Sequence, residues 1–252
     1  MDAFRRGEID LAYIGLPPAI IGIDSGLPLK CISGGHEEGT VIAAGKNSPS
    51  FPETDNLKTI LSGFRSIGVP GSGSIHDIIL RDTLESTDVN IPVINFPWAD
   101  EALEAFLNGK IDAVVGTPAL AQAVIHFGGG KIVWPPSRLW PSNPSYGIVV
   151  RNDLISERKN DLIDFVKTHA KLSEILTKTP ELVSPGIARL LGFVDEEFVL
   201  NTIRISPRYT HLISKDYVSC TLQLARRMKE LGYIKRDFQE DDIFDYTILE
   251  SL

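Results

Sequence analysis

Three things are scarce in this 252-residue chain: cysteine, long apolar runs and positive charge. Cys31 and Cys220 are the only cysteines, which excludes a disulfide framework and a cysteine-based metal site. A single bridge between them stays open, although both lie in apolar stretches, where an unpaired cysteine behaves as a small buried hydrophobe. No run of about 18 apolar residues occurs, so the sequence predicts no membrane-spanning helix.

The shortage of positive charge argues against a nucleic-acid partner. There are 25 basic and 33 acidic residues, which gives a formal net charge of −8, and phosphate binding depends on Lys and Arg releasing counterions. The basic cluster at 226–229 is followed by an acidic segment at 237–242, a pattern typical of a solvated helix face and turn. A composition of 43% hydrophobic and 23% charged residues is that of an ordinary globular protein.

Helix and strand patterns alternate through the first 150 residues. Apolar stretches such as RSIGVP, VNIPVINF and IDAVVG have the length of buried strands, and ETDNLKTILSG and ADEALEAFLNG have the period of amphipathic helices. This order predicts an α/β fold with a mostly parallel sheet flanked by helices. After Arg151 the patterns are almost entirely helical, which predicts a helical C-terminal portion.

One phrase of the sequence is nearly repeated about a hundred residues later. FRRGEIDLAYIGLPPA, residues 4–19, aligns with FLNGKIDAVVGTPALA, residues 106–121, when one residue is deleted. Each phrase has the pattern of a helix end, a glycine, a strand and a Gly-x-Pro loop. The repeat predicts two similar α/β lobes, each with such a loop at the carboxyl end of a strand, where open α/β sheets bind ligands.

Asp10 and Asp112 occupy equivalent positions in the two phrases. Each follows a glycine turn, where a carboxylate can accept hydrogen bonds from nearby backbone N–H groups. We therefore interpret both as turn residues rather than as catalytic groups.

Several segments together resemble one protein family along nearly the whole chain. They are the GEIDLAYIG phrase, GTVIAAGKNSPS, SIGVPGSGSIHDIIL, NFPWADEALEAFLNGKIDAVV, SYGIVVRND and LGYIKRDFQEDD. Their order is similar to that in solute-binding proteins of ABC importers. The resemblance is to the NMT1/THI5-like branch, which serves nitrate, taurine, alkanesulfonates and pyrimidine precursors of thiamine.

The resemblance implies a two-lobed type II periplasmic-binding fold, in which each lobe is a mostly parallel sheet flanked by helices. Two crossover strands near residues 36–42 and 145–151 would join the lobes. Lobe 1 would comprise residues 1–41 and 148–252, and lobe 2 residues 42–147. The resemblance also implies a small-molecule solute, an ABC permease in the membrane as partner, no cofactor, a monomer, and a periplasmic or other extracytoplasmic location.

The sequence departs from that family at its start. Family members begin with a leader and a first strand-helix-strand unit, and neither precedes the phrase at 4–19. Such a unit takes about 30 residues or more, so either the start codon is placed too late, or the chain is a truncation whose lobe 1 lacks part of its sheet and of its binding wall. A chain without a leader would also be cytoplasmic if Met1 is the true start.

The stretch GSGSIHD, residues 71–77, is the strongest local candidate for ligand binding. Its glycines let the backbone approach a ligand, and the start of the following helix would present N–H groups to an anion or carboxylate. We therefore expect Ser72, Gly73, Ser74 and His76 to bind the solute. The alternative is a capping box, in which Ser74 and Asp77 satisfy those N–H groups internally. Both interpretations hold if Ser72 faces the ligand.

Two further groups of residues complete the predicted site. The Gly-x-Pro loops would contribute Gly15, Pro17, Pro18 and Thr117, although turn chemistry alone also explains these residues. The first crossover would contribute His36 and Glu37, which a solvated turn explains almost as well. His36, Glu37 and His76 have no recognised metal-ligand spacing, so we predict no metal site.

The sequence favours an organic solute over an inorganic anion. A net charge of −8 gives no long-range attraction for an anion, and the predicted binding loops contain no arginine. Arg138, Arg204 and Arg208 could reach the site only from elsewhere in the fold. We therefore expect a small organic solute, with sulfonate, carboxylate and pyrimidine-like compounds left open.

Binding without catalysis is the function that the sequence favours. It contains neither the GxSxG motif of serine hydrolases nor the HExxH motif of zinc proteases. The alternative is a cytoplasmic enzyme of the pyrimidine-precursor or menaquinone-pathway type, because relatives of the family's fold include such enzymes. His36 or His76 would then be the general acid or base. A ligand sensor is a third alternative, which is disfavoured because no DNA-binding segment is attached.

Overall fold

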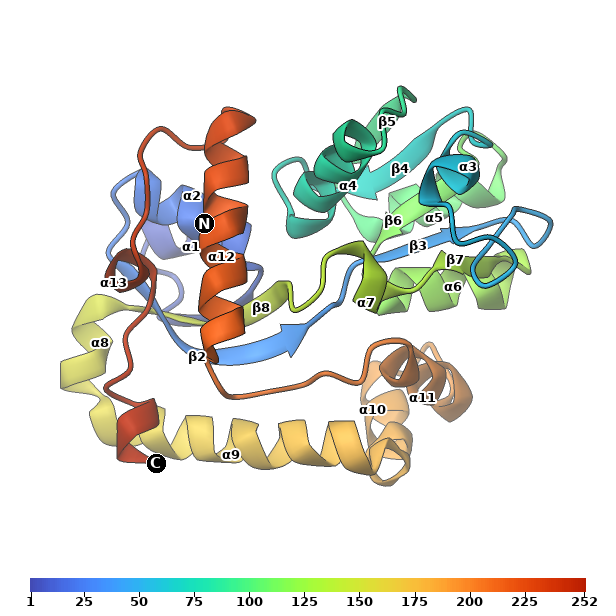
Figure 1. Ribbon diagram of the computed structural model, residues 1–252. Helices are drawn as coiled ribbons and strands as arrows, with labels where there is room; N and C mark the ends of the chain where they lie inside the picture. The colour runs from blue at the N-terminus through green and yellow to red at the C-terminus, as the bar shows by residue number, and fades with distance from the viewer. The chain divides into compact units, whose positions relative to one another are not determined.

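The computed structural model describes residues 1–252, which form two compact units. Unit 1 comprises Met1–Glu37, Ser142–Thr179 and Arg208–Leu252, and unit 2 comprises Glu38–Pro141 and Pro180–Pro207. Each unit contains one sheet with helices packed against it (Figure 1). None of the helices combines the length and the apolar content that a membrane crossing requires.

The sheet of unit 1 has three strands, in the order β1-β8-β2. They are β1 (Leu11–Ile14), β8 (Pro144–Arg151) and β2 (Leu29–Glu37). Both pairings are antiparallel, with Tyr13 opposite Ile148 and His36 opposite Tyr146. The prediction of a mostly parallel sheet is therefore wrong for the strand pairings of unit 1. The reason is that β8, from a distant part of the sequence, lies between β1 and β2 and runs antiparallel to both.

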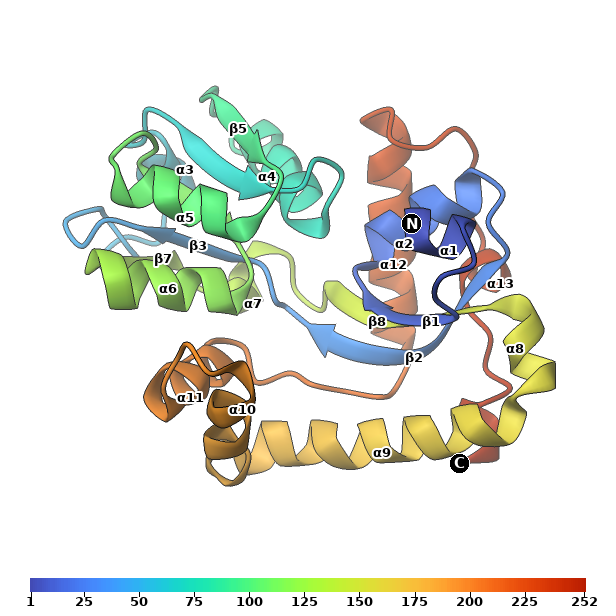
Figure 2. The same ribbon diagram turned by 180° about the vertical axis from the view of Figure 1, so that it is seen from behind.

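Helices cover both faces of this sheet. One face carries Ile148 and Val150, which pack against Val166 of α9. The other face packs against α2 and α12, which also contact each other, and Figure 2 shows the same arrangement from behind. The helices of unit 1 are α1 (Asp2–Arg5), α2 (Leu16–Asp24), α8 (Asn152–Glu157), α9 (Lys159–Lys178), α12 (Lys215–Glu230), α13 (Glu240–Ile243) and the 3-10 helix η2 (Leu249–Ser251).

The sheet of unit 2 has five strands, in the order β5-β4-β6-β3-β7. They are β3 (Val41–Ala44), β4 (Ile67–Pro70), β5 (Val93–Phe96), β6 (Ala113–Gly116) and β7 (Lys131–Trp134). β4 is parallel to both β5 and β6, whereas β3 is antiparallel to β6 and β7. Four of the five strands therefore run in one direction, as the alternation of strands and helices predicts.

Alternating side chains of β6 build two apolar cores in unit 2. Ala113 and Val115 belong to the core beneath α3 and α4, and Val114 belongs to the core beneath α5 and α6. This is the period of two that a strand buried on both faces requires. The helices are α3 (Leu57–Leu61), α4 (Ile75–Ser86), α5 (Ala99–Leu107), α6 (Pro118–Gly128), α7 (Pro136–Leu139), the 3-10 helix η1 (Pro180–Leu182), α10 (Ser184–Leu191) and α11 (Glu196–Ile205).

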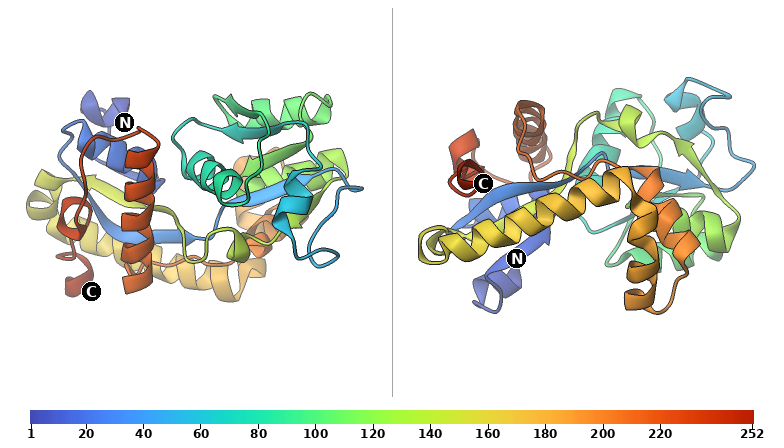
Figure 3. Two further views of the ribbon diagram at one scale, coloured as in Figure 1. Left: turned by 45° about the horizontal axis from the view of Figure 1, so that its top comes forward. Right: turned by 90° about the horizontal axis from the view of Figure 1, so that it is seen from below.

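The segment Pro180–Pro207 lies in unit 2, whereas the sequence assigned all of 148–252 to the first lobe. Its helices α10 and α11 lie side by side (Figure 3), and α11 packs against α6. Ile205 joins the same apolar core as Val124. An amphipathic pattern shows that a helix covers an apolar surface but does not identify which surface, so the sequence could not place this segment.

Cys31 and Cys220 are not joined by a disulfide; Cys31 is buried in β2 and Cys220 is partly exposed on α12. Burial raises the pKa of the Cys31 thiol to about 12. Cys31 thus behaves as the small buried hydrophobe expected from its apolar surroundings.

Candidate functional site

The polar loops predicted to bind a solute gather at one end of the unit 2 sheet. β4 and β6 are parallel neighbours, and they end at Pro70 and Gly116. The loop with Ser72 follows the first strand, and Thr117 follows the second. We call this end the unit 2 edge; it comprises Thr40, Ser72, Gly73, Ser74, His76 and Thr117.

The loop that leads into α4 is held by internal hydrogen bonds. The Ser74 hydroxyl accepts the Asp77 backbone N–H at 3.2 Å and donates to the Pro70 carbonyl at 2.9 Å. The Asp77 carboxylate accepts the Gly73 N–H at 2.9 Å. The cap expected from Ser74 is therefore confirmed, but the full capping box does not form, because Asp77 accepts from Gly73 and not from the Ser74 N–H. Ser72 is exposed.

Asp77 is wholly buried and has further polar partners. It accepts hydrogen bonds from the Arg81 Nε at 2.9 Å and from the Asn95 side chain at 3.2 Å. The Arg81 guanidinium also donates to the Asn95 oxygen at 3.2 Å. The spacing of four residues between Asp77 and Arg81 is a signal that sequence reasoning could have used, whereas nothing local indicates Asn95.

His76 is the second residue of α4 and is nearly buried. Its Nδ1 lies 2.9 Å from the hydroxyl oxygen of Thr40, which immediately precedes β3 and is wholly buried. Sequence reasoning missed Thr40, because only the antiparallel pairing of β3 with β6 brings it to this edge.

Thr117 is the N-cap of α6, and its exposed side chain accepts the Leu120 N–H at 3.2 Å. Pro118 occupies the first turn and has no N–H to donate. The turn interpretation of this loop is therefore correct.

The corresponding end of the unit 1 sheet holds the other predicted residues. Gly15 is the N-cap of α2, and Pro17 and Pro18 lie in its first turn. A Cβ added at Gly15 would lie 3.4 Å from the Ser145 carbonyl, so this loop packs against β8. We call this end the unit 1 edge; it comprises Gly15, Pro17, Pro18, His36, Glu37, Tyr146 and Tyr209.

His36 lies in a group of aromatic rings at the unit 1 edge. Its ring centroid is 4.6 Å from that of Tyr209 and 5.8 Å from that of Tyr146, with interplanar angles of 33° and 30°. Burial raises the pKa of both tyrosine hydroxyls above the ordinary value of 10, so both are neutral near pH 7. The tyrosines were missed because they join His36 only through β8 and the segment after 207.

Glu37 forms an ion pair at the same edge, with 2.7 Å between its Oε2 and the Arg208 guanidinium. Of the three arginines considered from the sequence, Arg208 is thus the one bonded to a predicted binding residue. Arg138 instead pairs with Asp55, and Arg204 pairs with Glu181. The acidic and basic groups at the unit 1 edge therefore neutralise each other.

The two aligned aspartates lie at the amino ends of their strands, away from these edges. Asp112 accepts the backbone N–H and the guanidinium of Arg65, each at 2.6 Å, which holds the pKa of the carboxyl below its usual range. Asp10 pairs with Arg151 at 3.4 Å. Asp112 accepts a backbone N–H as expected, but its donor lies 47 residues away rather than in the local turn.

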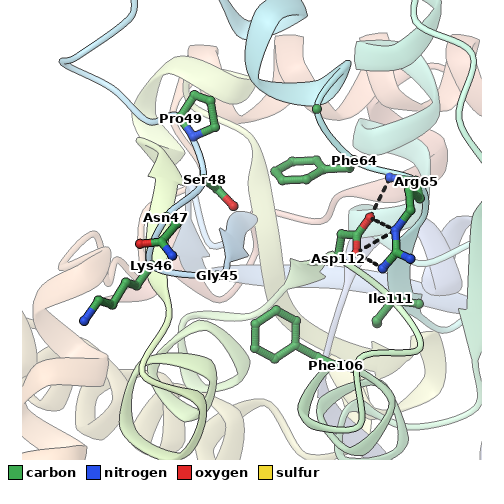
Figure 4. A pocket seen from close by; sticks show the side chains of 11 residues that line it. Gly45, Lys46, Asn47, Ser48, Pro49, Phe64, Arg65, Phe106, Ile111 and Asp112 are labelled. Atoms are coloured by element: carbon green, nitrogen blue, oxygen red, sulfur yellow. Dashed lines mark hydrogen bonds and ion pairs between the residues drawn. The ribbon is translucent and has the colours of Figure 1, made fainter.

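A cavity of about 580 Å³ lies next to Asp112, at the opposite end of the unit 2 sheet from the unit 2 edge (Figure 4). None of the predicted binding residues lines it. No group of three or more His, Cys, Asp or Glu side chains in the structure is arranged to hold a metal ion.

Comparison of the chain with known proteins identifies a family. A family model described as the NMT1-like family matches residues 1–184. No curated protein matches the chain. The family match agrees with the resemblance drawn from the sequence segments.

Solved structures share the fold along nearly the whole chain. The ligand-binding component of an ABC-type import system from Staphylococcus aureus, with zinc bound, is 19% identical with a TM-score of 0.78, and the alignment covers 99% of this chain and 83% of that one. The periplasmic aliphatic sulphonate-binding protein SsuA from Escherichia coli is 16% identical with a TM-score of 0.80, and the alignment covers 96% of this chain and 82% of SsuA. The periplasmic nitrate-binding protein NrtA from Synechocystis PCC 6803 is 14% identical with a TM-score of 0.71, and the alignment covers 96% of this chain and 73% of NrtA. The likeness confirms the predicted fold class.

Proposed function

The chain belongs to the NMT1-like family, and on that premise we propose that it is the solute-binding component of an ABC importer. It binds a small organic solute and delivers it to a membrane permease from the extracytoplasmic side. The observation that carries the proposal is the gathering of predicted binding residues at one end of each sheet. The structural relatives described as ligand-binding components of import systems support it.

The helix starts at the two edges disfavour an inorganic anion. An anion binds at a helix N-terminus through free backbone N–H groups and the positive end of the helix dipole. In α2, Pro17 and Pro18 remove two of these donors. In α4, the Asp77 carboxylate takes the Gly73 N–H and adds its own negative charge. In α6, Thr117 caps the Leu120 N–H.

The rings at the unit 1 edge favour a flat solute. His36, Tyr146 and Tyr209 present aromatic rings, and both tyrosine hydroxyls are neutral near pH 7, a combination suited to a heterocycle that stacks and accepts hydrogen bonds. The Glu37–Arg208 pair offers no net charge for an ionic solute. A pyrimidine-like compound is therefore our first choice, ahead of sulfonates and carboxylates.

The proposal treats the chain as a binding protein rather than an enzyme. The described functions of its structural relatives support this, since they are binding proteins of import systems. The stacking of His36 in the aromatic group also fits a role in binding a flat solute.

The test is a thermal-shift and calorimetric titration of the full chain with 4-amino-2-methylpyrimidine, ethanesulfonate, acetate and nitrate. A solute at 100 times its Kd stabilises the folded protein by about 2.7 kcal/mol. We expect the pyrimidine to stabilise the protein and nitrate to have no effect. Saturable nitrate binding tighter than that of the pyrimidine would refute the solute class, and no response to any of the four would leave the function without support.

Matched variants locate the binding residues. Tyr209→Ala should weaken pyrimidine binding by about 2- to 13-fold, the effect of losing one aromatic contact, while Tyr209→Phe should bind nearly normally. Ser72→Ala at the unit 2 edge should weaken binding, and Ser62→Ala, at an exposed serine that follows α3, should not. Equal effects of Ser72→Ala and Ser62→Ala would exclude Ser72 from the site.

A further inference from the structure

The cavity beside Asp112 lies apart from the residues of the proposed function, within unit 2. It opens at the amino ends of β4 and β6, whereas Ser72 and Thr117 follow the carboxyl ends of the same strands. Its volume of about 580 Å³ is within the range of small-molecule sites. The cavity is lined by Gly45, Lys46, Asn47, Ser48, Pro49, Gly63, Phe64, Arg65, Phe106, Ile111 and Asp112.

Two aromatic rings form apolar walls of this cavity. Phe64 belongs to the core on one face of the sheet and is only 6% exposed, and Phe106 packs against the core on the other face. Figure 4 shows both rings directed toward the cavity, on opposite sides of it, with Ile111 nearby. Because both rings are anchored in packed cores, they provide fixed surfaces for a flat apolar group.

The polar side of the cavity is positively charged in an acidic unit. Unit 2 carries 15 acidic and 9 basic side chains, but the cavity lining has Lys46 and Arg65 against the single acid Asp112. Asp112 engages the Nε and one terminal nitrogen of Arg65, so the other guanidinium nitrogen keeps its donors. Lys46 is exposed, and in Figure 4 its side chain is directed outward from the cavity, so it would have to turn inward to meet a ligand.

The loop after β3 adds neutral hydrogen-bonding groups. The Ser48 hydroxyl points toward the centre of the cavity, and Asn47 lies beside it (Figure 4). Gly45 also lines the cavity, and the space beside it is open, because a Cβ added there would meet no atom within 4 Å. The cavity thus combines a flat apolar space with donors and a net positive charge on its polar side.

We propose that this cavity is a second binding site, for a small monoanion with a flat apolar body, of the aromatic carboxylate class. The body lies between the rings of Phe64 and Phe106, and the carboxylate accepts from Ser48 and Arg65, with Lys46 closing over it. The proposal stands independently of the solute-binding function, since it uses none of the residues at the two edges.

Benzoate is the probe for this site, with benzamide as its neutral counterpart of the same shape. In calorimetric titrations of the full chain we expect benzoate to bind saturably and to weaken as salt is raised, and benzamide to bind at least about tenfold more weakly, because charge-assisted hydrogen bonds are roughly twice as strong as neutral ones. Equal binding of the two compounds, or no saturation by benzoate, would overturn the proposal.

Two variants place the benzoate in this cavity. Gly45→Val should abolish benzoate binding by placing a branched side chain in the open space beside Gly45, while Gly186→Val, which also adds a side chain in open space without a left-handed backbone, should leave it unchanged. Lys46→Gln should weaken binding by about two- to fivefold. Thermal unfolding checks that each variant folds.

A third variant separates this site from the proposed solute site. If benzoate bound at the unit 2 edge instead, Ser72→Ala would weaken it and Gly45→Val would not, and that outcome would overturn this inference while supporting the solute site. Loss of pyrimidine binding in Ser72→Ala together with unchanged benzoate binding is the result expected if both proposals hold.

Discussion

Asp77→Ala tests the view that a buried carboxylate holds the loop at the unit 2 edge. Asp77 is wholly buried and accepts from the Gly73 N–H, Arg81 and Asn95 at 2.9 to 3.2 Å. Removing one partner of a buried ion pair costs about 3–5 kcal/mol. The Arg81 side chain is 35% exposed, so water recovers part of that cost, and we expect a loss of about 2–4 kcal/mol.

Tryptophan fluorescence during urea unfolding is a suitable assay, because Trp98, Trp134 and Trp140 all lie in unit 2. With a slope of about 2 kcal/mol per molar urea, the midpoint should fall by about 1–2 M. The urea midpoint of Asp77→Asn should lie between those of the wild type and Asp77→Ala, since asparagine keeps the shape of the side chain and one acceptor oxygen.

Asp100→Ala is the matched control, since Asp100 also lies in the first turn of a unit 2 helix but is exposed. Its loss should be about 0.3–1 kcal/mol, the contribution of an acid at a helix start. If Asp77→Ala costs no more than Asp100→Ala, the buried hydrogen bonds do not hold the loop and the reasoning is refuted.

Three further predictions concern unit 1. Burial lowers the pKa of His169 below 6.5. Because folding disfavours the charged ring, the contribution of His169 to the free energy of unfolding is complete above about pH 6.5 and is lost as the pH falls below that value. An NMR titration midpoint at or above 6.5 would contradict this. Gly147→Ala should lower the free energy of unfolding by about 1–3 kcal/mol, because the added Cβ would lie 2.7 Å from the Cys31 sulfur; an unchanged melting temperature would argue against it. The pKa of about 12 and the burial of Cys31 predict that a thiol reagent at pH 8 labels at most Cys220 until denaturant is added, and two labels on the folded protein would disprove this.

Much of the local structure could be predicted from neighbouring residues. The alternation of patterns correctly indicated α4 and α6 after their strands, and Ser74 and Thr117 cap these helices with their own side chains. Caps and turns depend on groups three or four residues apart, so their chemistry can be read directly in the sequence.

The partners of the candidate binding residues could not be predicted in this way. Thr40 reaches His76 only because β3 pairs antiparallel with β6, and Tyr209 reaches His36 only because the chain returns to β2 after unit 2. Nothing near either residue in the sequence carries that information. The cavity beside Asp112 likewise arises from three loops that meet at one end of a sheet.

The sequence by itself determined the class of fold, the order of helices and strands, and the loops that end them, because these follow from periodicity and from contacts within a few residues. Only the tertiary structure decided that β8 lies between β1 and β2, that residues 180–207 pack in unit 2, and that Arg208 pairs with Glu37, 171 residues away. The physical reason is that apolar burial and charge pairing are set by where surfaces meet in space, and many distant segments of one chain offer chemically equivalent surfaces.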